Sequence, residues 1–297
     1  MKKTLIAASL ALATATAHAI NIEFDTSYDT GASILSQAQI DVLDYVANEF
    51  GTRLTDSLTA TSYSSISFFN PGNNPLNDTV SLNNQTIAAD TLRIYVGASE
   101  LTGSTVGFGG SGGFSGFGDL SRGQTGAGFT DVAIWGGAIT FNANTDWYVD
   151  DNPATLEGFS GSQIDFYSVV VHELAHVLGF GISGSWNRLA TSTAFSGEAS
   201  IAAYEAATGT PQTSVPLVGA SHWVEGTKSF VDGVLQEASL DPTITTGTRK
   251  YMTDLDWAAL SDLGWQVAPA APVPEAHTWA MMLAGLGLLG WRQRHRA

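Results

Sequence analysis

Apolar side chains recur at helical spacing in several stretches of the chain. Between residues 34 and 58 they come every three or four positions and the opposite face is polar, which predicts an amphipathic helix. A second helix is predicted to begin at Ser162 and Asp165, in the manner of a capping box, and to run to Leu178. Two more are predicted over residues 196–207 and from Thr253 to Leu263, the last ended by Gly264.

Other stretches alternate in the way strands do. Leu92, Ile94 and Val96 alternate with Arg93 and Tyr95, which predicts a half-buried strand. Residues 132–141 predict another strand, with a break at the two glycines 136 and 137. Helices and strands are mixed without regular βαβ alternation, so the predicted fold class is α+β.

A glycine-rich segment lies between these two strands. Residues 103–128 contain 11 glycines and no phosphate-loop lysine, so we expect a flexible surface loop and no nucleotide site.

The N-terminus has the pattern of a secretory signal. Lys2 and Lys3 precede an apolar stretch, and Ala17-His18-Ala19 provides small residues for cleavage. We expect signal peptidase to cleave after Ala19, which makes residues 1–19 a signal peptide of an exported protein.

The C-terminus has a second targeting pattern. After an Ala/Pro linker at residues 267–272, the tail 273–297 carries Pro274-Glu275, an apolar stretch and three closely spaced arginines. It resembles the PEP-CTERM sorting signal of Gram-negative bacteria, with Ala276 where the second proline usually stands. The resemblance implies transient membrane anchoring through the tail, processing by an exosortase, and delivery to the surface, the extracellular matrix or the medium.

Composition narrows the function of the remaining domain, residues 20–266. The 297-residue chain has no cysteine, which excludes disulfides and thiolate metal sites. Without the two ends, residues 20–272 hold 7 basic and 27 acidic residues, a formal net charge of −20. Such a surface argues against nucleic-acid binding. Calcium binding by some of these acids stays open, although no EF-hand spacing occurs.

The motif that carries chemistry is VVVHELAHVLGF, residues 169–180. His172 and His176 are four positions apart, so a helix places both imidazoles on one face, where they can share a cation. Glu173 is expected to reach a metal-bound water and take its proton. This H-E-x-x-H arrangement predicts a zinc site.

A catalytic zinc needs a third protein ligand. Within residues 20–272 the one further histidine is His222, in the run GASHWVEG, so His222 is the predicted third ligand. Two acidic residues on the predicted downstream helix, Glu198 and Glu205, are the alternative.

HELAHVLGF, followed after a long insertion by SHW, resembles the metzincin zinc endopeptidases, and the late third histidine resembles their leishmanolysin-like branch. The resemblance spans roughly residues 130–265. It implies a twisted mixed sheet with an edge strand over the cleft and an active-site helix. It also implies zinc on His172, His176 and His222, and Glu173 as general base. The edge-strand role is carried over to residues 136–143, which would pair with an extended peptide.

One feature of the metzincins is missing. They place a methionine in a turn beneath the zinc, and the corresponding stretch VLQEASLDP has Gln236 there. Met252 is the one methionine of residues 20–272. Tyr251 is either an oxyanion-stabilising tyrosine, as in some relatives, or a packed surface side chain, and we favour the second interpretation.

The expected function is hydrolysis of peptide bonds in an extended polypeptide by an exported zinc endopeptidase. Two alternatives stay open. One is a surface or matrix protein with a structural or vestigial zinc site. The other is an adhesion module without metal.

Overall fold

A computed structural model describes residues 20–31, 34–116, 122, 135–150, 152–155, 159 and 161–269. The predicted signal peptide and sorting tail therefore lie outside the described residues. The chain divides into two compact units, Met1–Val267 and Ala268–Ala297, and every element described below belongs to the first. Within the described residues no helix combines the length and the apolar character that crossing a membrane requires.

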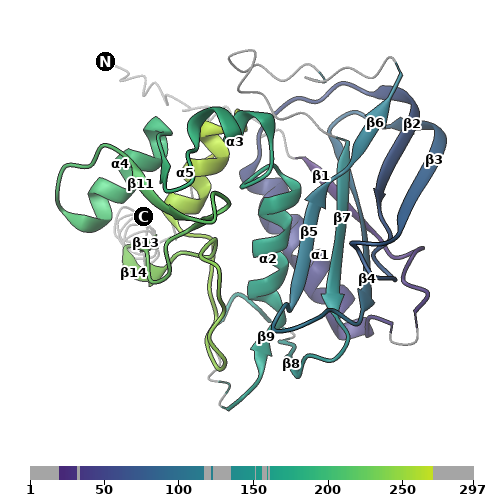
Figure 1. Ribbon diagram of the computed structural model, residues 1–297, viewed down its shortest axis with the longest axis horizontal. Coiled ribbons are helices and arrows are strands. Elements are labelled where there is room, and N and C mark those ends of the chain that lie inside the picture. The colour runs from purple at the N-terminus through teal and green to yellow at the C-terminus, as the bar shows by residue number, and fades with distance from the viewer. Residues whose placement is uncertain are drawn as a thin grey trace, which may run out of the picture. The chain divides into compact units, whose positions relative to one another are not determined.

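The main sheet has four strands in the order β1 (Asn21–Asp25), β4 (Thr91–Ser99), β7 (Gly136–Asn142) and β5 (Gly107–Ser111). β1, β4 and β7 are parallel, and β5 runs antiparallel to β7. The sheet is thus mixed, and β5 forms one of its edges (Figure 1).

Both faces of the main sheet are covered. α1 (Gln37–Arg53) and α2 (Phe166–Val177) pack on one face, and a second sheet of β2 (Thr61–Phe69), β3 (Thr79–Ile87) and β6 (Gly113–Ser115) lies on the other (Figure 1). Leu92, Ile94 and Val96 of β4 enter the large helix-side core, whereas Tyr95 enters a smaller core with β2. β4 is therefore buried on both faces, and the prediction of a half-buried strand is wrong.

The predicted helices are all present with shifted ends. α1 begins after the capping box of Ser36 and Gln39. α2 is capped by Asp165 alone, whose carboxylate accepts from the Ser168 N–H, so Ser162 plays no part in the cap. α5 (Asp254–Asp262) begins at Thr253, and Gly264 follows its C-cap with a φ of 108°.

Short elements complete the second half of the fold. They are β8 (Trp147–Tyr148), β9 (Ile164–Asp165), α3 (Gly184–Leu189), β10 (Ala194–Phe195), α4 (Glu198–Thr208), β11 (Val215–Val218), β12 (His222–Trp223), β13 (Lys228–Val231) and β14 (Val234–Glu237). The observed class is a mixed α/β fold with several small sheets and few helices.

The structure corrects two predictions, one about the glycine-rich segment and one about the edge strand of the main sheet. Part of it, residues 107–115, forms β5 and β6 instead of a loop, while residues 117–121 and 123–128 lie outside the described residues. β7, the predicted edge strand of residues 136–143, is an inner strand because β5 pairs with its far side. The edge strand over α2 is therefore β5.

Candidate metal centre

α2 holds His172, Glu173 and His176 in a rigid setting. Nearly every residue of the helix is buried, and its N-cap Asp165 receives two hydrogen bonds from the buried Arg249 guanidinium, at 3.0 and 2.8 Å. Such a bidentate pair fixes the start of the helix in position and orientation. The two histidines, one turn apart, therefore point from one helix face.

His222 reaches the same place from a distant part of the chain. Its strand β12 pairs with β11, and the Trp223 N–H donates to the Leu240 carbonyl. Trp223 is fully buried in an aromatic cluster with Phe180, Trp186 and Phe195. This cluster packs the long insertion after α2 against the helix and brings His222 back to it.

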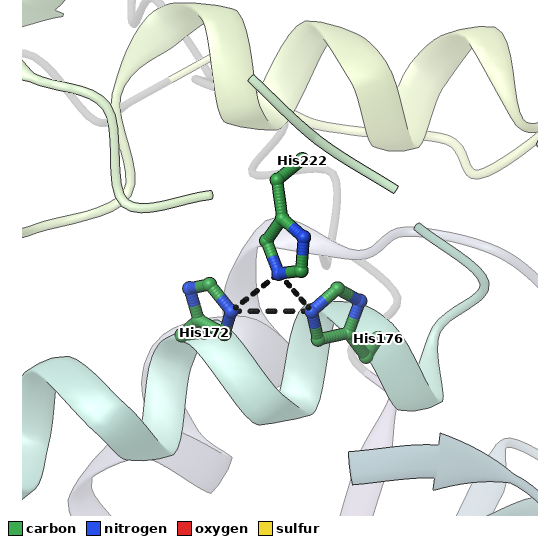
Figure 2. A group of neighbouring side chains, drawn as sticks. All are labelled: His172, His176 and His222. Carbon is green, nitrogen blue, oxygen red and sulfur yellow. Dashed lines mark hydrogen bonds between the residues drawn. The ribbon is translucent and has the colours of Figure 1, made fainter. Parts of the chain in front are cut away.

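The three imidazoles converge through their Nε2 atoms (Figure 2). The Nε2–Nε2 distances are 3.1 Å between His172 and His176, 3.2 Å between His176 and His222, and 3.3 Å between His172 and His222. Zn–N bonds of about 2.05 Å in a tetrahedron place two ligand nitrogens about 3.3 Å apart. The three side chains thus fit a tetrahedral zinc ion, with a fourth position left for another ligand.

The hydrogen bonds behind two of the rings give their Nε2 atoms the form that binds a cation. Nδ1 of His172 lies 2.7 Å from the Ser239 carbonyl, and Nδ1 of His176 lies 2.8 Å from the Phe180 carbonyl. Because a carbonyl only accepts, each Nδ1 carries the proton and each Nε2 of the neutral ring presents a lone pair. Two hydrogen-bond acceptors therefore face each other at 3.1 Å, an arrangement that a shared cation would stabilise.

Burial keeps the three rings neutral. It lowers the pKa of His172 well below its usual value, and the imidazoles of His176 and His222 lower it further. It lowers the pKa of His176 to about 4, with a further contribution from the His222 imidazole. Burial also lowers the pKa of His222. Neutral imidazole is the form that binds metal, so the site is ready for a cation at neutral pH.

Glu173 lies against the glycine-rich edge strand. Burial raises the pKa of its carboxyl to about 8, and a hydrogen bond from the Gly109 N–H opposes that rise. A Cβ on Gly107 would lie 2.6 Å from Glu173 Oε1, and one on Gly109 would lie 2.4 Å from the Glu173 carbonyl oxygen. The strand approaches the helix this closely because both positions are glycine. A dication in the triad would favour the ionised carboxylate.

Asp256 joins the segments that support the histidines. Its buried carboxylate accepts from Trp223 Nε1 at 2.9 Å, from the Ser239 N–H at 2.9 Å, and from Thr253. One side chain therefore links α5 to the strand of His222 and to the carbonyl behind His172. The sequence does not reveal this role, although the three-residue spacing of Thr253 and Asp256 is typical of a helix start.

The other residues considered at the sequence level lie elsewhere. Glu198 and Glu205 are on α4, and neither belongs to a group of potential metal ligands among the described residues. Gln236, on β14, exchanges hydrogen bonds with the Tyr251 main chain, and Met252 is buried in the core. The Tyr251 hydroxyl donates to the Pro153 carbonyl at 3.1 Å, as expected for a packed side chain.

In a second group of potential ligands, Glu225, Glu237 and Asp241, two members already contact a cation of the chain itself. Lys250 Nζ lies 2.6 Å from Asp241 Oδ1 and 3.3 Å from Glu237 Oε2, and it donates to the Thr243 carbonyl. Burial raises the pKa of Asp241 to about 7, against the lowering effect of Lys250. Glu237 and Asp241 therefore form ion pairs with Lys250, whereas Glu225 accepts a hydrogen bond from the Thr243 hydroxyl.

Comparison with known proteins identifies the tail alone. The family model described as the PEP-CTERM protein-sorting motif matches residues 272–296. No curated protein and no solved structure matches the chain significantly. The tail indicates an exported protein that is sorted to the cell surface of a bacterium, and it implies processing by an exosortase.

Proposed function

We propose that this protein is an exported zinc-dependent endopeptidase of metzincin type. The observation that carries the proposal is the convergence of three imidazole Nε2 atoms within 3.1–3.3 Å of one another, with Glu173 next to the first of them in sequence. All four side chains line one cavity, so a substrate and the proposed metal site would meet there.

His172, His176 and His222 would hold the zinc ion. When bound, zinc supplies Lewis acidity, which polarises a carbonyl group and makes water more acidic. The Ser239 and Phe180 carbonyls keep the first two rings in the tautomer that ligation needs.

Glu173 is the proposed general base. Its carboxylate would take a proton from the attacking water and give it to the nitrogen of the leaving amine. The Gly109 N–H and the close approach of β5 hold the side chain in one place. Burial on this side also excludes bulk water from the carboxyl group.

The substrate is proposed to be an extended polypeptide that lies along β5. Gly107, Phe108 and Gly109 line the cavity, and β5 ends the main sheet. Main-chain groups of an added strand would pair with such an edge, as in other peptide-binding sheets.

A second candidate function is a surface or matrix protein with a structural or vestigial zinc site. It is favoured by Gln236 at the position expected for methionine and by the Tyr251 hydroxyl, which is engaged with Pro153. Either protein would be released or attached outside a Gram-negative cell after its tail is processed.

The test is the variant Glu173→Gln in the zinc-loaded protein. The amide keeps the shape of the side chain but cannot accept the proton, so casein cleavage should fall by about 10²–10⁴-fold while the zinc content stays unchanged. Glu100→Gln, an exposed acid-to-amide change, is the matched control and should cleave normally. Zinc retention without cleavage by the wild type supports the structural site, and wild-type rates in Glu173→Gln contradict the assignment of the base.

A further inference from the structure

The cavity of about 630 Å³ at the metal centre extends past His172 toward the N-terminal end of α2. Val169, one turn before His172, lines it there on the same helix face. Residues of the segment 239–250 form another part of the lining. The side chains that line this end are Ile164, Val169, Ser239, Asp241, Ile244 and Lys250.

Two buried oxygen atoms at this end lack hydrogen-bond partners in the described part of the chain. They are Oδ2 of Asp241 and Oγ of Ser239, on residues that are 1% and 3% exposed. Buried polar atoms are rarely left without a partner, and a bound ligand is one way in which they are satisfied.

The charge at this end is negative. Asp241 and Lys250 line the cavity. Glu225 and Glu237 are not part of the lining, but each brings a carboxylate oxygen within 4.8 Å of one from Asp241. Lys250 Nζ contacts Asp241 Oδ1 and Glu237 Oε2 and donates to the Thr243 carbonyl. The Glu237 carboxyl also lies close enough to raise the pKa of Asp241, and Asp241 Oδ2 has no hydrogen-bond donor among the described residues. One lysine does not neutralise three acids, so a further cationic donor would be attracted.

We propose, on the basis of the proposed function, that this end of the cavity binds a lysine or arginine side chain of the substrate. Its aliphatic stem would pack on Val169 and Ile244, and its N–H groups would donate to Asp241 Oδ2 and Ser239 Oγ. A leucine side chain would leave both oxygens unsatisfied, and a glutamate would meet like charge.

The experiment uses peptides that are identical except at the positions flanking the cleaved bond, which carry lysine, norleucine or glutamate in turn. Cleavage by the zinc-loaded wild type is measured at pH 8, where the Asp241 carboxyl is ionised. Binding of the same peptides to zinc-loaded Glu173→Gln is measured separately by fluorescence anisotropy. At one position lysine should exceed norleucine by tenfold or more in kcat/KM and in affinity, because the site is built for hydrogen-bond donors.

Two variants assign the preference to its residues. Asp241→Asn should reduce it to less than threefold, and Glu100→Gln should leave it unchanged. Since loss of the Asp241 charge could unfold the chain, Ser239→Ala is the second variant. It removes an unpartnered hydroxyl, so it should preserve the fold and reduce the lysine preference severalfold.

The outcomes separate the two proposals. Cleavage without a lysine preference at any position overturns the basic subsite and leaves the endopeptidase proposal standing. Absence of cleavage overturns the endopeptidase proposal, and the binding measurement then decides the subsite. Equal binding of the lysine and norleucine peptides overturns the basic subsite, and tighter binding of the lysine peptide supports it.

Discussion

At the scale of single residues, the candidate metal centre depends on the groups that hold the imidazoles of His172 and His176 from behind. A ring whose Nδ1–H donates to a fixed main-chain carbonyl keeps its Nε2 lone pair aimed at one point. For His172 that carbonyl belongs to Ser239, and Asp256 in turn accepts from the Ser239 N–H. The histidines could be found from their spacing. The role of Asp256 could not, because the partners that connect it to the histidines, Trp223 and Ser239, lie 33 and 17 positions away in sequence.

The buried histidines predict a pH dependence of the zinc-free protein. Unfolded His176 binds a proton below about pH 6.5, whereas the folded ring, with its pKa lowered to about 4, does not. The contribution of His176 to the free energy of unfolding is therefore fully present above pH 6.5. It falls by about 3 kcal/mol as the pH drops to 4.

Glu173 has the opposite effect on the pH dependence of the free energy of unfolding. Its folded pKa of about 8 exceeds the unfolded value of 4.5, so its contribution falls as the pH rises between these values. The measurement is urea unfolding in the presence of a chelator, from pH 7 to 4.5, for the wild type and for His176→Gln. Both proteins contain Glu173, so its contribution to the free energy of unfolding is present in both. The wild type should lose more stability on acidification than His176→Gln, and parallel curves would contradict this prediction.

At the scale of elements, β5 and α2 together provide the edge strand and the helix of the candidate site. α2 was predictable because its apolar face, its cap and the H-E-x-x-H spacing all agree. β5 was not, because glycine has low strand propensity and the run GFGGSGG is typical of a loop. Its strand conformation comes from pairing with β7 and from packing on Glu173, which are tertiary contacts.

Two consecutive glycines on β5, which face opposite sides of the sheet, give a matched pair of variants. In Gly109→Ala the new methyl group would lie 2.4 Å from the Glu173 carbonyl oxygen, so the strand or the helix has to shift. We expect a loss of about 1–3 kcal/mol in unfolding free energy and weaker cleavage. In Gly110→Ala the methyl would meet Phe69 at 3.5 Å, an ordinary contact, so the stability should change by less than about 0.5 kcal/mol. Equal effects of the two variants in thermal unfolding would refute the close-packing account.

At the scale of the whole molecule, a targeting tail accompanies a domain that carries the candidate metal centre. The sorting motif at residues 272–296 accounts for export and surface delivery, but it does not indicate what is delivered. The activity is therefore inferred from the domain alone. In the second half of this domain, several short elements separate His222 from α2 in the sequence, yet the fold places His222 beside α2. The histidine count predicted this contact, but the sequence did not show which elements would produce it.

The central claim is that these three imidazoles bind one divalent ion. Its most direct test is zinc content and affinity, measured by chelator competition on the purified full chain, for the wild type, His222→Ala and Glu198→Gln. The account predicts about one zinc per chain in the wild type and in Glu198→Gln, and an affinity at least 100-fold lower in His222→Ala. A His222→Ala protein that binds zinc as tightly as the wild type, or a wild type that binds none, would contradict it.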